Sequence, residues 1–186
     1  MRNNLAKNFL SCIFSLLLFL GAVGVARAVE PASPAPDNNQ AWLSNQVRHR
    51  LVMLPWYSLF DNLEYRVDGS KVTLFGQVVQ PALKSEAGSV VKSIEGVSEV
   101  DNRIEVLPPS PFDSQIRRAE YFSIFSFPSL SRYSLGTNPQ IHIIVNSGHV
   151  TLEGVVSSQA DKNAAGIRAS MVPNVFSVTN NLRIEG

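Results

Sequence analysis

The chain has 186 residues, with 16 basic and 15 acidic side chains, and its single cysteine, Cys12, lies in an apolar N-terminal run. Beyond that run no thiol remains, which excludes disulfides, thiolate metal sites and cysteine nucleophiles. Three basic residues lie within the first 28, so the remaining 13 face 15 acidic ones, a net charge of −2. This balance provides no overall attraction to nucleic acid or to an anionic membrane, and we expect no nucleic-acid partner.

Residues 1–28 have the three parts of a secretory signal peptide. A short basic start precedes an uncharged apolar run, which ends on Ala26 and Ala28 at the small-residue positions of a cleavage site. We therefore expect export, to the periplasm, with cleavage after Ala28. The run is also about long enough to span a bilayer, so an uncleaved membrane anchor is the alternative. Residues 29–39 are rich in Pro and Ala and are predicted to form a flexible leader.

Helical and strand-like segments then follow in a regular order. Leu43, Val47 and Leu51 recur at helical spacing, and Pro55 ends that helix because the residue before a proline leaves the α region. Alternating apolar residues around Asp68-Gly69 are typical of a β-hairpin. The predicted elements are a helix over 37–54, a hairpin over 65–78, a helix over 81–96 and a strand over 97–107.

The same order recurs in the second half of the chain. Its second helix begins with a capping box made by Ser158 and Asp161, and Asp113 is predicted to cap the first. The predicted elements are a helix over 113–125, a hairpin over 141–156, a helix over 158–172 and a strand over 175–185.

The two halves are copies of one unit. Residues 72–107 and 150–185, compared without a gap, are identical at 12 of 36 positions. A solenoid usually needs three or more repeats, so two copies indicate two self-contained modules. We predict an α+β fold with two tandem α-β-β-α-β modules, over 40–107 and 112–185. Each is expected to be a small three-stranded mixed sheet with two helices on one face.

Seven glycines are interpreted as turn or packing residues. Glycine in a strand or helix lowers stability unless a turn or a close backbone contact needs it. No glycine-rich phosphate-binding pattern is present. The seven are Gly69, Gly76, Gly88, Gly96, Gly148, Gly154 and Gly166.

This order of motifs is similar to the BON domain, a family named for bacterial osmotic-stress and nodulation proteins. In the first copy the matching residues are Val67, Asp68, Gly69, Val72, Leu74, Gly76, Val78, Ala87, Gly96, Val97, Val100, Asn102 and Ile104. In the second they are Gly148, Val150, Leu152, Gly154, Val156, Ala165, Val175, Val178, Asn180 and Leu182. The second copy departs at Asn174, where the family commonly has glycine. The resemblance implies a non-enzymatic envelope module that binds phospholipid or assembles with envelope machinery.

No arrangement of residues indicates catalysis or metal binding. His142 and His149 flank one hairpin, but neither has a third ligand at helical or hairpin spacing. We therefore expect no enzyme activity, no metal and no cofactor.

A group of aromatic and basic residues is harder to assign to one core. The helix 114–127 carries apolar residues over an arc of about 160°, wider than one core stripe. One side is expected to meet its own sheet. The other side either meets the first module or contacts a membrane surface or a protein partner. The candidate contact residues are Arg117, Arg118, Tyr121, Phe122, Phe125, Phe127, Arg132, Trp56 and Tyr57.

Two functions follow from these alternatives. The first is binding to a phospholipid membrane surface, for envelope maintenance or stress tolerance. The second is a scaffold that binds a protein partner in an envelope or secretion complex, through exposed sheet edges or the aromatic residues. The sequence does not indicate an oligomeric state.

Overall fold

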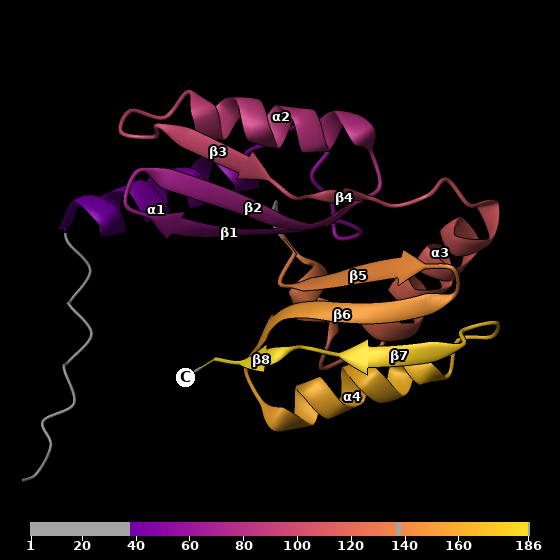
Figure 1. Ribbon diagram of the computed structural model, residues 1–186. Coiled ribbons are helices and arrows are strands. Elements are labelled where there is room, and N and C mark those ends of the chain that lie inside the picture. The colour runs from indigo at the N-terminus through magenta and orange to yellow at the C-terminus, as the bar shows by residue number, and fades with distance from the viewer. Residues whose placement is uncertain (1–37, 137–138, 186) are drawn as a thin grey trace, which may run out of the picture. The chain divides into compact units, whose positions relative to one another are not determined.

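The computed structural model describes residues 38–136 and 139–185, which belong to one unit of the chain (Figure 1). The predicted signal peptide and leader residues 29–37 lie outside these residues. Within the described ranges, no helix has the length and apolar character needed to cross a bilayer.

The first module pairs a hairpin with a parallel third strand. β1 and β2 are antiparallel, β3 is parallel to β2, and β4 continues that pairing further along β2. α1 packs against β1, and α2 packs against β2, β3 and β4. The elements are α1 (Asn38–Val52), β1 (Asn62–Asp68), β2 (Lys71–Val78), α2 (Pro81–Lys92), β3 (Glu99–Asn102) and β4 (Glu105–Val106).

The second module repeats this arrangement in a separate sheet. β5 and β6 are antiparallel, and β7 and β8 pair in parallel with β6. A short 3-10 helix, η1, is an addition that the sequence patterns did not predict. The elements are α3 (Pro111–Phe125), η1 (Ser131–Ser134), β5 (Ile141–Asn146), β6 (His149–Val156), α4 (Gln159–Ser170), β7 (Ser177–Asn180) and β8 (Arg183–Ile184).

The predicted fold class is confirmed, and the strand registers are the same in both copies. Val72 pairs with Val100 and Leu74 with Asn102, and the residues 78 positions later make the same pairs. The fourth, two-residue strand of each sheet is the far end of the predicted last strand. Each module has its own cluster of buried apolar side chains between its sheet and its helices.

The paired mid-helix glycines make room for an asparagine. A Cβ on Gly88 would lie 2.8 Å from Nδ2 of Asn102, and a Cβ on Gly166 would lie 2.8 Å from Nδ2 of Asn180. Each of these amides donates to a helix carbonyl oxygen, that of Lys84 or its counterpart in α4, at 2.7 Å. The glycines therefore allow a close helix–strand contact.

Asp113 does not cap its own helix. Ser110 is the N-cap of α3, and its Oγ accepts a hydrogen bond from the Asp113 backbone N–H at 3.1 Å. The buried Asp113 carboxylate instead accepts from the backbone N–H groups of Ser147 and Gly148, at 3.0 and 2.9 Å. It thereby joins the start of α3 to the turn between β5 and β6.

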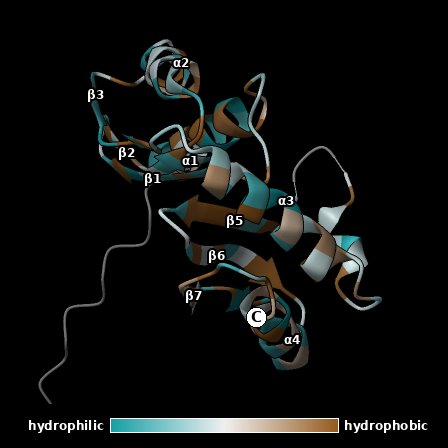
Figure 2. Cartoon of the chain, turned by 90° about the vertical axis from the view of Figure 1, so that its right-hand side faces the viewer, coloured by the Kyte–Doolittle hydropathy of each residue, from teal (hydrophilic) through white to brown (hydrophobic). Residues whose placement is uncertain are grey.

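The loop before β1 packs on β5. The backbone N–H of Ile143 donates to the Leu59 carbonyl at 2.7 Å, and the rings of Tyr57 and His142 stack with centroids 5.5 Å apart. Leu59 and Phe60 also pack against the apolar cluster of the second module. As a result β5 is buried on both faces from Ile141 to Val145, and most of it has the hydrophobic colour in Figure 2. β1 instead alternates between more and less buried residues.

Candidate functional site

The structure divides the candidate contact residues of α3 between core and surface. Phe125 is buried in the second module's apolar cluster, and Tyr121 is half-buried against the same cluster. Arg117 is 5 % exposed, and its Nη2 donates to the Val145 carbonyl at 2.6 Å. Burial lowers its pKa, although Asp113 and Asp61 act in the opposite direction.

Phe122 and Arg118 of α3 face solvent, as does Phe127 just beyond it. Phe122 is 67 % exposed, and its ring contacts only the edge of Tyr121 among the described aromatic pairs. The guanidinium of Arg168 lies 5.8 Å from the centroid of Phe127. In the first module Trp56 is exposed and Tyr57 is half-buried, where burial raises the Tyr57 pKa to about 12.

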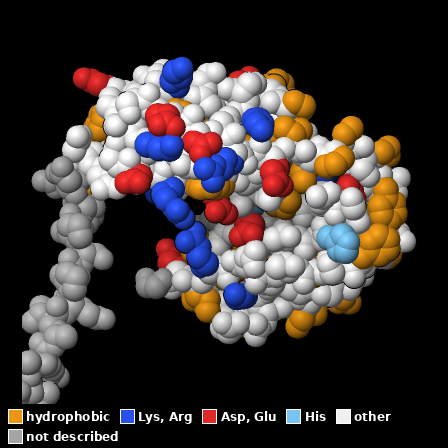
Figure 3. All heavy atoms as spheres, viewed as in Figure 1, with side chains coloured by type: hydrophobic (Ala, Val, Ile, Leu, Met, Phe, Trp, Pro, Cys, Tyr) orange, Lys and Arg blue, Asp and Glu red, His pale blue; other side chains and the backbone are white. Residues whose placement is uncertain are grey.

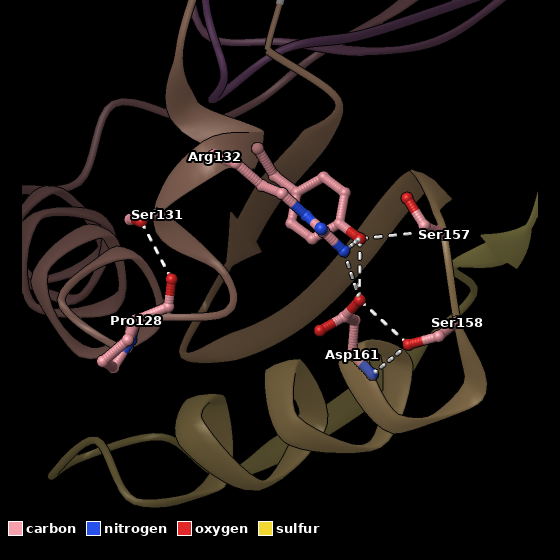
Figure 4. Close-up of polar contacts among 7 residues, drawn as sticks. Pro128, Ser131, Arg132, Ser157, Ser158 and Asp161 are labelled. Carbon is pink, nitrogen blue, oxygen red and sulfur yellow. Dashed lines mark hydrogen bonds and ion pairs between the residues drawn. The ribbon is translucent and has the colours of Figure 1, made fainter.

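Arg132 belongs to a polar cluster at the start of α4 (Figure 4). Its Nη2 lies 2.8 Å from Oδ2 of Asp161 and donates to the Tyr133 hydroxyl at 2.8 Å. The same Asp161 oxygen accepts from Tyr133 and Ser158, each at 2.9 Å. Burial by itself would raise the Asp161 pKa, but hydrogen bonds from Tyr133 and Ser158 outweigh it and the pKa is lowered. This arginine therefore has a structural partner.

The outer side of α3 and α4 combines exposed apolar groups with cations. The two helices lie together, because Arg168 Nε donates to the Ser123 carbonyl and Ser123 Oγ donates to the Arg168 carbonyl, both at 2.7 Å. On α4, Ile167 is 62 % exposed, and Met171 at its end is 64 % exposed. The acids of both helices, Asp113, Glu120 and Asp161, are all buried. The charged groups that reach solvent from these helices are therefore basic: Arg118, Lys162 and Arg168.

The corresponding positions of the first module are serines. At the 78-residue offset of the repeat, Ile167 corresponds to Ser89 and Met171 to Ser93. Phe176, which is 71 % exposed, corresponds to Ser98. The alignment of the two copies shows these apolar residues at positions that are serine in the first copy. The sequence prediction missed them because it chose candidate residues by the clustering of aromatic side chains.

We call Phe122, Ile167, Met171 and Phe176 the α3–α4 apolar surface. Figure 3 shows hydrophobic side chains gathered beside a histidine, on the side where Figure 1 draws the end of α4 and the start of β7. The basic and acidic side chains visible on that face gather elsewhere. Phe176 lies beside a histidine, because its ring centroid is 5.9 Å from that of His149.

A mixed polar cleft of about 710 Å³ lies between α1, β1 and the strands of the second module. Its carboxylates already have amide partners: Glu64 accepts from Asn62 at 2.8 Å, and Glu153 accepts from Asn181 at 2.7 Å. His142 contributes a buried ring, and burial lowers its pKa. Among the described residues, no group of three His, Cys, Asp or Glu side chains is placed to hold a metal ion.

A comparison with protein-family models identifies the modules. The BON domain model matches residues 39–108 and 130–186. The chain belongs to the BON domain family. This membership supports a non-catalytic, envelope-associated role. The second match begins at residue 130, but α3 contributes Ile116, Ile124 and Phe125 to the second core. We therefore propose that α3 belongs to the second BON module.

Other comparisons add little. No curated protein matches the chain. Among solved structures, the C-terminal domain of CdsD, a structural protein of the type III secretion system of Chlamydia trachomatis, is 12 % identical. The alignment covers 77 % of this chain and 98 % of that one, with a TM-score of 0.28. A second CdsD structure gives the same identity and TM-score and is covered to 92 %. A score this low carries no argument about function.

Proposed function

We propose that this protein is exported to the periplasm and, without catalysing a reaction, binds phospholipid membrane surfaces in envelope maintenance or stress tolerance. Its contact is the α3–α4 apolar surface, together with the cations of α4, Lys162 and Arg168. The observation that carries the proposal is the replacement of three serines by exposed Ile, Met and Phe in the second module.

Exposed apolar groups on helices whose solvent-exposed charges are all basic suit the headgroup region of an anionic bilayer. Full burial of one such side chain contributes about 1.5–3 kcal/mol, and a cation near an anionic surface contributes about 1 kcal/mol. The costs of association offset part of this sum. We therefore expect weak, reversible binding that strengthens with the anionic lipid fraction and weakens with salt.

A protein partner is the alternative occupant of the same surface. Apolar groups alone do not distinguish a protein partner from a membrane, since exposed apolar patches mark protein and membrane contacts alike. The absence of exposed acids on the described α3 and α4 favours an anionic surface over a mixed protein one. A partner remains an outcome of the test below.

Vesicle flotation with exchanges between the copies tests the proposal. The double variant Ile167→Ser and Met171→Ser gives α4 the residues of its counterpart helix, so the fold should persist while vesicle binding falls at least tenfold. Met53→Ser is the matched control, because Met53 is as exposed as Met171 but lies in the first module. That variant should bind vesicles like the original protein.

The outcomes separate the two occupants. Loss of flotation in the double variant, with an unchanged circular dichroism spectrum, supports the membrane contact. An original protein that stays in solution at every anionic lipid fraction refutes it. In that case crosslinking in envelope extract, lost in the same double variant, would assign the surface to a protein partner.

A further inference from the structure

A second, smaller cavity of about 240 Å³ lies where the loop before β1 and the start of α2 meet α3. It is separate from the α3–α4 apolar surface, and none of the four residues of that surface lines it. The polar residues that line it are Ser58, Asp61, Gln80, Ser114, Arg117 and Arg118. Two of them are arginines from consecutive positions of α3.

Arg117 presents an unpaired donor in this cavity. The side chain is 95 % buried, and although Nη2 is bonded to the Val145 carbonyl, Nε has no hydrogen-bond partner among the described residues. A buried N–H without an acceptor costs about 1–3 kcal/mol, and more on a charged group. The geometry therefore calls for an acceptor in the cavity.

Asp61 does not fill that role. Its Oδ1 accepts from the Val79 backbone N–H at 2.7 Å, and its Oδ2 accepts from the Ser58 N–H and Oγ at 3.0 and 2.6 Å. Among the described residues, neither Arg117 nor Arg118 lies within 4.0 Å of a carboxylate oxygen in an ion pair. The carboxylate is therefore occupied with capping, and the two arginines and one aspartate give the cavity lining a net charge of +1.

In the second module a carboxylate pairs with an arginine at the start of a helix. There the carboxylate of Asp161 lies at the start of α4, bonded to Arg132 and to Ser158. In the first module the counterpart of Asp161 is Leu83, and the N-cap Gln80 makes no side-chain capping bond. In the first module the carboxylate beside the helix start comes instead from Asp61, which accepts from the Val79 N–H and, among the described residues, forms no ion pair with an arginine.

We propose that this cavity binds a phosphate group, which accepts hydrogen bonds from Arg117 Nε and from Arg118. A guanidinium matches the geometry and charge of phosphate oxygens, and the net positive charge of the lining favours an anion. The ligand would contact Ser58 and Gln80 of the first module and α3 of the second, so it would also hold the two modules together. The group is either inorganic phosphate or the headgroup of a phospholipid.

Phosphorus NMR and thermal unfolding of the purified protein test this proposal with inorganic phosphate as the probe. Binding to the protein should broaden the phosphorus resonance of inorganic phosphate. Phosphate should also raise the melting temperature of the protein relative to chloride at equal ionic strength. Arg118→Gln should weaken binding at least fivefold, and Arg117→Met should abolish it. Arg50→Gln removes an exposed arginine of α1 outside the cavity and should change nothing. If Arg117→Met fails to fold, Arg118→Gln alone decides.

Vesicles distinguish the two sources of phosphate. Binding of free phosphate that is lost in the cavity variants supports a small-ion site. If free phosphate does not bind, but anionic vesicles bind less well to Arg118→Gln than to Arg50→Gln, the site takes a lipid headgroup. If neither probe distinguishes these variants, the proposal is overturned and the cavity holds water only. Because the Ile167 and Met171 variants leave this cavity intact, the two proposals can fail separately.

Discussion

Replacing Glu120 by valine should stabilise the protein and remove part of its pH dependence. α1 and α3 each bury three residues at four-residue spacing: Leu43, Val47 and Leu51 in the first, Ile116, Glu120 and Ile124 in the second. Glu120 therefore occupies a core position of α3, in a row that is wholly apolar in α1. It is 0 % exposed, and neither carboxyl oxygen has a hydrogen-bond partner among the described residues.

Burial is the cause of a large change in the Glu120 pKa. With no opposing charge nearby, removal from water raises its pKa from 4.5 to about 8. The folded protein then holds a proton that the unfolded chain releases above pH 4.5. The stability that depends on this proton is therefore fully present below pH 4.5 and is lost as the pH rises through the folded-state pKa of about 8. At about 1.4 kcal/mol per pH unit the loss is at most about 5 kcal/mol, and water penetration should reduce it to about 2–3 kcal/mol.

Urea unfolding from pH 5 to pH 9, followed by circular dichroism, measures this loss. Other titrating groups are common to both proteins, so the difference between the original and Glu120→Gln isolates the carboxyl. From pH 5 to pH 9 the unfolding free energy of Glu120→Gln should rise by about 2–3 kcal/mol relative to that of the original protein. Glu120→Val should show the same slope and be more stable throughout. A difference that stays constant from pH 5 to pH 9 would refute the burial argument.

Four further predictions concern single residues of the two modules. Gly88→Ala should destabilise the first module by about 1–3 kcal/mol in urea unfolding, because the new Cβ meets Asn102; adding Asn102→Ala should cost less than the sum of the two single changes. Gly154→Ala should cost at least about 2–3 kcal/mol, since its φ is +125° and a Cβ would overlap the Gln140 carbonyl oxygen. Gly69→Ala, at φ +58° in open space, should cost only about 1–2 kcal/mol. Asp161→Asn should remove a stabilisation that is present above the ordinary aspartate pKa and is lost as pH falls through the lowered pKa, visible in acid unfolding.

The order of elements and the division into two sheets could be predicted from the sequence. Strand alternation and helix spacing depend on neighbours along the chain, and both copies carry them. The same holds for the glycine that faces Asn102, because a glycine inside a helix costs stability unless something packs against it.

Which side of α3 reaches solvent could not be predicted. Phe122 and Phe125 are 60° apart in projection, so the width of the apolar arc allowed either to be exposed. The decision depends on contacts distant in sequence. Leu59 and Phe60 pack against the second core, and nothing in their local pattern indicates β5 as their neighbour. For the same reason Arg117 was expected at the surface and lies buried.

The differences between the two copies point in one direction. The second module has a carboxyl group inside, in a helix row that is apolar in the first module, and Ile, Met and Phe outside, at the positions of serines. An unpaired buried carboxyl lowers stability, and exposed apolar groups lower solubility. Packing requirements of the common fold explain neither change, because the first module satisfies that fold without them. Both changes affect the side of the second module formed by α3 and α4. A module that departs from its copy against its own stability and solubility is the one whose surface we expect to bind.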